Sequence, residues 1–173
     1  VILPKDTVFE YDKMKDSKKF SSSKKILEVA EHIKEHALAW SVTYNDEKTV
    51  DKINIRQSVL TSMHHSVKNV IDVTTGANTG ANTGANTGVI KNHEFFLLVD
   101  GNDFKPYMRF NNDEFLPINH VCIEGGDNKY CAIAAASILA KTERDKYIEE
   151  LCEEHPDLKE KYGLHTNKGY GTQ

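Results

Sequence analysis

The sequence predicts an α/β fold, in which strands and helices alternate along the chain and pack in layers. Short apolar runs of strand character alternate with longer segments whose apolar residues recur at helical spacing. One of the runs, Glu94–Asp100, is continuously apolar between its two acidic ends, as in a strand buried on both faces. A second run, His120–Glu124, leads through a glycine turn into an alanine-rich segment. Alanine favours helix, and its small side chain lets a helix lie close to what it packs on, which we expect to be the sheet.

Length and composition predict one globular domain over residues 1–173. The chain is 39% hydrophobic and 28% charged, as in soluble proteins, and 173 residues are enough to bury a core. No apolar run approaches the roughly 20 residues that span a bilayer, so we expect no membrane association. The chain begins at Val1 in what reads as the end of a strand and stops at Gln173 after a glycine-rich motif, so we expect a domain truncated at both ends.

Charge and cysteine content limit the partners and the compartment. The net charge of −4 does not indicate nucleic-acid binding, but it does not exclude it, because metal ions can bridge an acidic site to a phosphate. The three cysteines, Cys122, Cys131 and Cys152, are odd in number and form no CxxC pair. They predict free thiols in a reducing, cytoplasmic compartment.

The first quarter of the chain predicts a polar loop, a helix and a strand. The loop, residues 5–23, is crowded with lysines, and Ser21–Ser23 can cap a helix that runs to about His36. Ala37–Tyr44 alternates and contains β-branched and aromatic residues, which predicts a strand.

One longer helix is expected next, capped by Asn45 or Asp46. Its apolar stripe consists of Ile53, Leu60, Met63, Val67 and Val70. A tandem GANT repeat, Gly76–Gly88, follows, with no hydrophobic residue except alanine. Such a segment cannot bury enough surface to offset its ordering entropy, so we expect a flexible insertion in a surface loop.

The second half contains two further strands and the alanine-rich helix. After Glu94–Asp100, residues 101–118 are expected to form a loop or a short hairpin, and His120–Glu124 a strand. The helix should run to about Glu154, before Pro156. The tail, YGLHTNKGYGTQ, reads as glycine-punctuated loop.

Two carboxylates, Asp100 and Asp145, are the candidate ligands of a divalent metal. Asp100 ends an apolar strand, and strand ends are where α/β proteins place catalytic and ligand-binding side chains. However, Asp–Gly is also a common turn pair. Asp145 lies on the alanine-rich helix four residues after Lys141, so it is alternatively half of a solvated Lys–Asp pair. Two acids are few for a two-metal site, which usually draws on more carboxylates.

Two segments are candidate contacts to a sugar or a phosphate. Tyr170 lies between two glycines, so its ring could stack on a sugar or base, or could belong to an ordinary turn. Lys18 belongs to the run Asp16–Lys19, which could donate to phosphates or could be a solvated charge run. The histidines show no ligand spacing, and we assign them no metal role.

The order of these segments and the residues in them resemble ribonuclease HII over nearly the whole chain outside the GANT repeat. The segments are DSKK (16–19), AWSV (39–42), INI (53–55), VDGN (99–102), GD (126–127), IAAASILAK (133–141), RD (144–145) and GYGT (169–172). The most specific among them are the stretch from AAASILAK to RD and its distance from VDGN.

This resemblance implies a ribonuclease H-like fold, with a mixed sheet flanked by helices. It implies hydrolysis of the RNA strand of RNA–DNA hybrids, and of ribonucleotides embedded in DNA, by four acids around two Mg²⁺ or Mn²⁺ ions. Asp100 matches the third acid and Asp145 the fourth, and Tyr170 matches a tyrosine that stacks beneath the sugar at the RNA–DNA junction. Lys18, Ser137 and Lys141 fall where contacts to substrate are expected. The implied partner is a hybrid duplex, and the protein is expected to be a monomer.

The chain departs from the family in lacking the Asp-Glu and Gly-Arg-Gly segment of the first strand and the C-terminal helix expected after GYGT. Two hypotheses follow. The whole protein is a metal-dependent endoribonuclease, of which these residues alone are expected to be inactive. Alternatively, the chain is a non-catalytic nucleic-acid-binding remnant of that fold.

Overall fold

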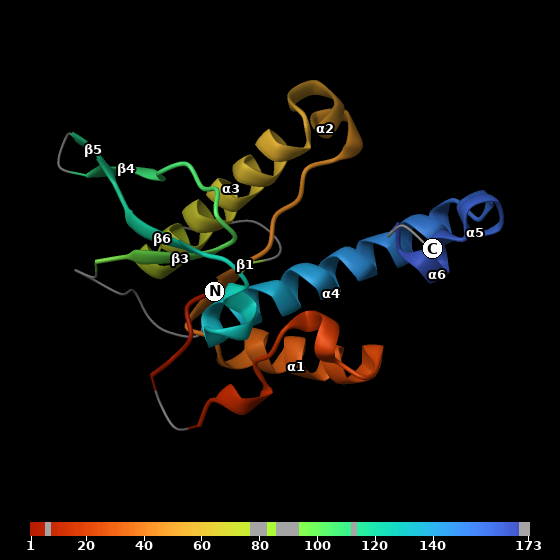
Figure 1. Ribbon diagram of the computed structural model, residues 1–173, viewed down its shortest axis with the longest axis horizontal. Coiled ribbons are helices and arrows are strands. Elements are labelled where there is room, and N and C mark those ends of the chain that lie inside the picture. Colours follow the sequence, from red (N-terminus) through yellow and green to blue (C-terminus); the bar gives the residue numbers. More distant parts are fainter. Residues whose placement is uncertain (6–7, 77–82, 86–93, 112–113, 170–173) are drawn as a thin grey trace.

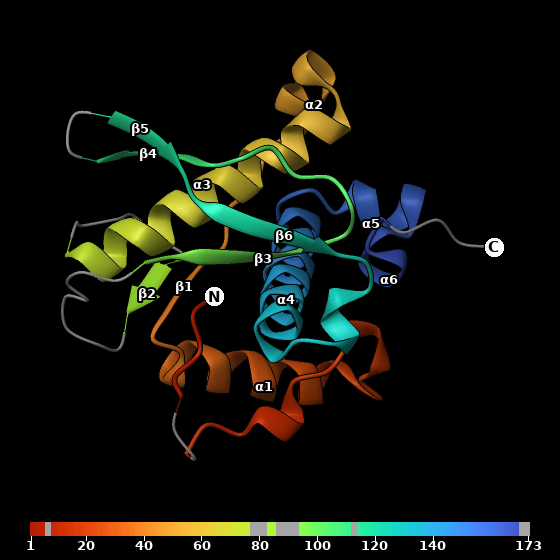
Figure 2. The same cartoon turned by 60° about the vertical axis from the view of Figure 1, so that its left-hand side comes forward.

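The computed structural model describes residues 1–5, 8–76, 83–85, 94–111, 114–169 and confirms the α/β architecture. Its longest helix, α4 (Cys131–Glu154), runs through the middle of the molecule. The strand pair formed by β3 (Phe96–Asp100) and β6 (Asn119–Ile123) lies on one side of α4, and helix α1 (Ser23–His36) lies on the other (Figures 1 and 2). None of the described helices combines the length and apolarity needed to cross a membrane.

The main core forms between α1 and α4. Helix α1 begins as predicted, with the Ser22 hydroxyl accepting the Lys25 N–H, and ends at His36. The buried cluster is shared by the N-terminal segment and both helices: Phe9, Met14, Ile26, Val29, Ala30, Ile33, Ala37, Ala134, Ala135, Ile138 and Leu139. The expectation that the alanines face the sheet is therefore incomplete, because Ala134 and Ala135 allow α1 to approach α4 closely.

Strands β3 and β6 pair in parallel, with Asp100 opposite Ile123. Both strands were predicted, but the expected burial of the first on both faces was wrong. Val99 is buried on one face, whereas Phe96 and Leu98 on the other are exposed in the part of the chain described. Parallel pairing brings the carboxyl ends of both strands to the same edge, which is the edge that carries Asp100.

The segment expected as one long helix is two helices. Asp46 caps α2 (Glu47–Ile53), as predicted, but Asn54 adopts φ +64° and starts a new helix, α3 (Ile55–Thr75). The Asn54 side chain accepts the Gln57 N–H, so it caps α3 while its backbone conformation breaks the apolar stripe.

The remaining elements are short. A hairpin of β4 (Met108–Asn111) and β5 (Glu114–Pro117) confirms one of the two alternatives for residues 101–118. Helix α4 ends at Glu154, as predicted. Two helices, α5 (Asp157–Tyr162) and α6 (Leu164–Asn167), follow it, so the expectation that the tail from Tyr162 is only loop was wrong.

Part of the GANT repeat contributes a strand. Strand β1 (Ala39–Ser41), shorter than the predicted Ala37–Tyr44, pairs antiparallel with β2 (Thr83–Ala85) inside the repeat. Gly84 lies opposite Trp40, and a Cβ atom at Gly84 would come within 2.6 Å of the indole Nε1. The repeat therefore supplies a residue small enough to pack beneath the indole. The expectation of a flexible insertion otherwise falls on residues outside those described.

We expect Gly84→Ala to destabilise the protein by at least about 1 kcal/mol, because the new methyl group overpacks against Trp40. Urea unfolding followed by Trp40 fluorescence measures the change. Gly80→Ala is the matched control, since Thr79-Gly80-Ala81 repeats the sequence of β2. Equal effects of the two substitutions would contradict the pairing of Gly84 with Trp40.

Candidate functional site

The site is built at the shared carboxyl end of β3 and β6. Asp100, the last residue of β3, is exposed, and its Oδ1 accepts the backbone N–H of Gly126 at 2.8 Å. A Cβ atom at Gly126 would come within 2.5 Å of Ile133 Cδ1 and 3.3 Å of Asp100 Oδ1. Only glycine therefore lets this turn approach both the start of α4 and the Asp100 carboxylate.

A second carboxylate, Asp127, directly follows the residue that binds Asp100. It lies in the 3₁₀ turn η3 (Gly126–Asn128), which Gly125 enters in the left-handed conformation, φ +61°. Asn128 Nδ2 donates to Asp127 Oδ1 at 3.0 Å. The loops after the two strands are also tied together, because Asn102 Nδ2 donates to Glu124 Oε1 at 3.0 Å. Three acids, Asp100, Glu124 and Asp127, therefore lie at the end of β3 or in the turn that follows β6.

These groups are oxygen donors of the kind that Mg²⁺ and Mn²⁺ prefer. Within the described residues, no three or more acidic, histidine or cysteine side chains converge closely enough to form a complete metal shell. The edge therefore offers carboxylates that suit a divalent ion, but not by themselves a closed cage.

The structure does not bring Asp145 to Asp100, so the expectation of a metal site shared by these two acids does not fit the geometry. The Asp100 edge contacts α4 at Ile133, and Asp145 lies twelve residues farther along the same unbroken helix. That separation corresponds to about 18 Å of helix axis. Ions about 3.5–4 Å apart cannot span it.

Asp145 instead belongs to a group of charges farther along α4. Its Oδ2 accepts a hydrogen bond from Lys141 Nζ at 2.9 Å, and its Oδ1 lies 3.9 Å from Arg144 Nη1. Lys141, expected to contact substrate, is therefore paired with Asp145. The pair with Lys141 agrees with the alternative interpretation of Asp145 as half of a Lys–Asp pair. The Asp145 side chain is about one-quarter exposed, so the pair is not fully solvated.

The lysine-rich loop docks beside the Asp127 turn. Its 3₁₀ turn η2 (Ser17–Lys19) contacts α4 through the Ser17 and Ser137 hydroxyls, 3.2 Å apart. The Lys19 ammonium donates to Asn128 Oδ1, next to Asp127. Lys18 lies between these two contacts and is exposed. Lys18 and Ser137 are thus near each other, as expected of groups that serve one site.

The Asp16 carboxylate shapes this loop. Asp16 Oδ1 accepts the Lys18 backbone N–H at 2.9 Å, and this hydrogen bond is the main cause that lowers the pKa of Asp16 below its ordinary value. The ionised carboxylate therefore caps η2 at neutral pH and helps present the two lysines that follow.

Tyr170 lies outside the described residues. The preceding residues, Lys168 and Gly169, are placed against α4 by a hydrogen bond from Arg144 Nη2 to the Lys168 carbonyl oxygen, 2.7 Å long. The chain therefore enters the Gly-Tyr-Gly motif from a position next to Arg144.

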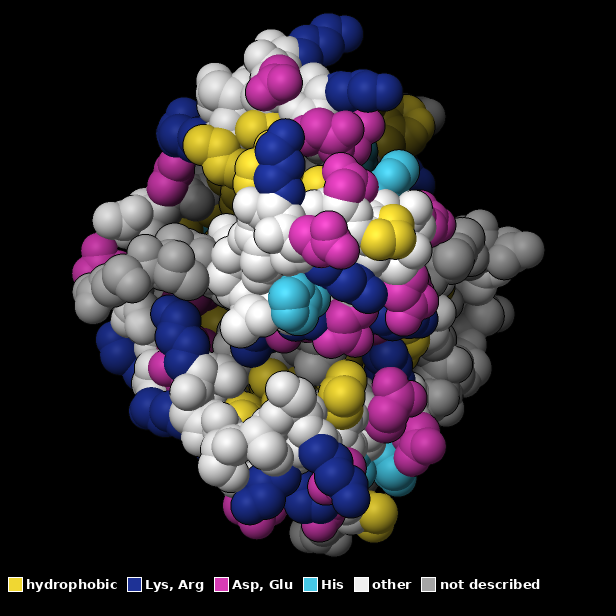
Figure 3. Space-filling view, turned by 90° about the vertical axis from the view of Figure 1, so that its right-hand side faces the viewer, with side chains coloured by type: hydrophobic (Ala, Val, Ile, Leu, Met, Phe, Trp, Pro, Cys, Tyr) yellow, Lys and Arg dark blue, Asp and Glu magenta, His cyan; other side chains and the backbone are white. Residues whose placement is uncertain are grey.

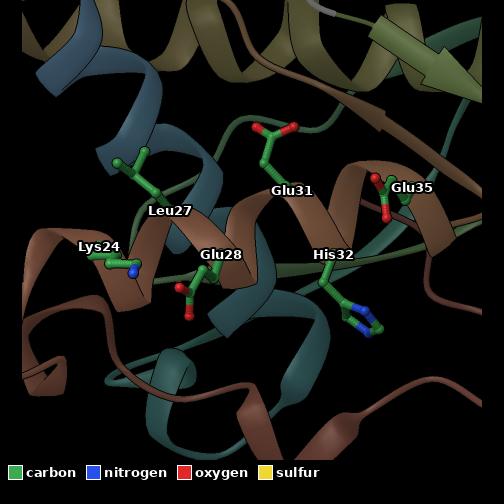
Figure 4. Close-up of a pocket in the computed structure, with 6 residues that line it drawn as sticks. All are labelled: Lys24, Leu27, Glu28, Glu31, His32 and Glu35. Atoms are coloured by element: carbon green, nitrogen blue, oxygen red, sulfur yellow. The ribbon is translucent and has the colours of Figure 1, made fainter.

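Two other surface features do not compete with this edge. A shallow hollow lies over α1, with all of its lining from that one helix (Figure 4): Lys24, Leu27, Glu28, Glu31, His32 and Glu35. Its three glutamates make it unsuited to a phosphate. The end of the molecule that carries α5 and α6 shows Lys and Arg side chains interspersed with Asp and Glu (Figure 3). Within the part described, this end of the molecule therefore shows no continuous basic patch on which a polyanion could bind.

Sequence reasoning gave Asp127 no role, although Gly126–Asp127 was part of the quoted pattern. Lys19 was included in the run Asp16–Lys19 as a possible phosphate contact, but it was not singled out. The available signal for Asp127 was a glycine-glycine turn directly after a strand parallel to the Asp100 strand. Such a turn must meet the end of its neighbour.

Comparison with known proteins gives a consistent match. A family model described as Ribonuclease HII matches residues 1–173. The protein named Ribonuclease HII from Cytophaga hutchinsonii is 35% identical over 173 residues, which is 100% of this chain and 69% of that protein. A protein of the same name from Bacteroides fragilis is 36% identical over the same shares. One from Chlorobium luteolum is 34% identical over 161 residues, covering 93% of this chain and 62% of its own.

Proposed function

The chain belongs to the ribonuclease HII family, and from this premise we propose that the protein is an endoribonuclease acting on the RNA strand of RNA–DNA hybrids. Ribonucleotides embedded in DNA are substrates of the same reaction. The alternative, a non-catalytic nucleic-acid-binding remnant, has no support in the comparisons, because the relatives above carry the name of an enzyme.

The enzyme is a metal-dependent hydrolase, and the carboxylates at the β3–β6 edge are proposed to hold two Mg²⁺ or Mn²⁺ ions. Asp100 and Asp127 are the proposed ligands from this chain, because one backbone segment, Gly126–Asp127, contacts the first and carries the second. When bound, such ions activate the attacking water and stabilise the leaving 3′-oxygen. Asp145, first expected as a ligand, is not part of this proposal because of its position along α4.

The chain's own groups then orient the substrate around these carboxylates. The Gly126 N–H holds Asp100 Oδ1, which directs the carboxylate before substrate arrives and avoids reorganisation during the reaction. Lys18 and Ser137 are proposed to contact the phosphate backbone from the side of η2, and Tyr170 to stack beneath a sugar. The ribose 2′-OH is the group that separates RNA from DNA at such a site. We further propose a cytoplasmic monomer whose partner is the hybrid duplex.

The decisive assay is cleavage of a DNA duplex containing one ribonucleotide, with Mg²⁺ or Mn²⁺ present and in excess EDTA. We expect cleavage at the ribonucleotide that needs the metal, and none of an all-DNA duplex. The assay uses the full-length protein encoded by the gene, because the chain spans 69% of the first two relatives. Binding of the hybrid without cleavage under any of these conditions would favour the remnant.

Lys18→Ala is expected to weaken hybrid binding by about three- to tenfold and to reduce the salt dependence by about one phosphate contact. The reason is that Lys18 is exposed between the two contacts that dock η2 beside Asp127. Fluorescence anisotropy across a salt series measures both quantities. Lys52→Ala, at an exposed lysine on α2, is the control and should change neither. An unchanged salt slope in Lys18→Ala would remove this residue from the interface.

A further inference from the structure

The Asn128 side chain joins the turn after β6 to the lysine-rich loop. Its Nδ2 donates to Asp127 Oδ1 at 3.0 Å, and its Oδ1 accepts a hydrogen bond from the Lys19 ammonium, across 109 residues of sequence. It also binds Asp16. After the Lys18 N–H, a hydrogen bond from the Asn128 side chain is the next cause that lowers the pKa of Asp16. One amide group therefore contacts three charged side chains from two segments of the chain.

The orientation of this amide follows from the charges around it. An ammonium group can only donate hydrogen bonds, so the amide oxygen must face Lys19. An ionised carboxylate can only accept them, so the amide NH₂ group must face Asp127 and Asp16. Flipping the amide end for end would bring donor against donor at Lys19 and acceptor against acceptor at Asp127. Lys19 thus fixes the amide in the orientation in which it donates to Asp127.

Both segments that the amide joins are held in place by other contacts. On the side of the loop, Ser17 is buried, and its hydroxyl lies 3.2 Å from that of Ser137 on α4. On the side of the turn, the Gly126 N–H donates to Asp100 Oδ1 at 2.8 Å. Because these contacts do not involve the amide, its loss should release the Asp127 side chain and leave the turn in place.

We propose that Asn128 is a positioning residue for Asp127, and that Lys19 fixes the Asn128 amide for this purpose. The inference rests on the proposed role of Asp127 as a ligand of a divalent metal. A carboxylate has about four acceptor positions on its two oxygens, so the hydrogen bond from Asn128 leaves capacity for a cation. A side chain that is already held in place loses less entropy when it binds. Asn128 therefore raises the affinity for metal without contacting metal or substrate.

This role separates Lys19 from its neighbour Lys18. Both are exposed lysines of η2, but Lys19 is bound to the Asn128 amide, whereas Lys18 is proposed to contact the phosphate backbone. Lys19→Met should therefore leave the salt dependence of hybrid binding unchanged, while Lys18→Ala reduces it by about one phosphate contact. In the metal-free protein, Lys19→Met should shift the NMR resonances of the Asn128 side-chain amide. Lys19→Arg keeps a charged donor and should restore them in part.

The central experiment is a calorimetric Mn²⁺ titration of the full-length protein and of its Asn128→Ala variant, without substrate. The substitution changes no charge, and it should weaken Mn²⁺ binding about tenfold, as is typical when a partner of a metal ligand is removed. In the cleavage assay, the metal concentration for half-maximal rate should rise by a similar factor. KM for the duplex at saturating metal should change less than about threefold. In an Asp127→Asn background the substitution should have no further effect on Mn²⁺ affinity, because both act through one carboxylate.

Asn102→Ala serves as the control for Asn128→Ala. It also removes an amide that donates to a carboxylate at this edge, Glu124 Oε1 at 3.0 Å, but Glu124 is not a proposed ligand. Its Mn²⁺ affinity should therefore stay within about twofold of that of the unmodified protein.

An Asn128→Ala variant that folds normally and binds Mn²⁺ as tightly as the unmodified protein refutes the positioning role. A reduced salt slope in Lys19→Met, with unchanged Asn128 resonances, makes Lys19 a phosphate contact and refutes its role in fixing the amide. If the unmodified protein does not cleave at a ribonucleotide, the proposed function fails instead, while the Mn²⁺ titration and the resonances still test the contacts of Asn128.

Discussion

Asp100→Asn is expected to lower cleavage of the single-ribonucleotide duplex by at least about a thousandfold. The substitution replaces an anionic oxygen at the proposed metal site by a neutral amide, and metal ions supply several kcal/mol of transition-state stabilisation. About 4 kcal/mol corresponds to a factor of a thousand in rate. The asparagine carbonyl oxygen can still accept the Gly126 N–H, so the fold should be retained. The measurement is single-turnover cleavage with Mg²⁺ and with Mn²⁺.

Asp103→Asn is the control for this substitution. It changes an aspartate only three residues farther along, which is paired with Arg56 at the surface and has no contact to the Gly126 turn in any described interaction. Its activity should remain within about twofold of the unmodified protein, since exposed ion pairs contribute little. Cleavage retained in Asp100→Asn, with thermal stability unchanged, would remove Asp100 from the site.

Asp127→Asn and Asp145→Asn are expected to differ strongly, although both remove one carboxylate. Asp127→Asn should reduce cleavage by at least about a hundredfold and raise the metal concentration needed for half-maximal activity, because a ligand is lost. Asp145→Asn should reduce cleavage less than about tenfold and leave that metal concentration unchanged, because its partners are Lys141 and Arg144. A metal titration of both variants gives the comparison.

The opposite order of the two effects would restore the assignment based on sequence alone. In that case Asp145 would act at the metal despite its position about 18 Å along the helix from Ile133, which would require a large rearrangement of α4. Equal and small effects of both substitutions would place the metal at other carboxylates.

Several elements could be predicted because their causes are local. The serine cap of α1, the alanine-rich α4 and the hairpin between Met108 and Pro117 each depend on residues within a few positions of one another. The break at Asn54 was missed although its cause is also local. In the sequence the helical spacing of apolar residues continues across Asn54, and only its positive φ shows that α2 and α3 are separate.

Of the two acids now proposed to bind metal, sequence reasoning named Asp100 but not Asp127, for a physical reason. A strand-end aspartate is visible in sequence, and Asp100 was identified in this way. Its partner depends on which strand lies next to β3 and in which direction that strand runs. Parallel pairing with β6 brings the Gly125–Asp127 turn to Asp100, whereas the helical path to Asp145 leads away from it.

The sequence by itself determined the family, the α/β class and the identity of one carboxylate proposed to bind metal, because motifs, local periodicity and strand ends are properties of neighbouring residues. The tertiary structure decided which acid accompanies Asp100, that α4 packs its alanines against α1, and that Asn128 connects Asp127 to the lysine-rich loop. These depend on contacts between segments far apart in the chain, which strand register and helix packing create and which local sequence does not encode.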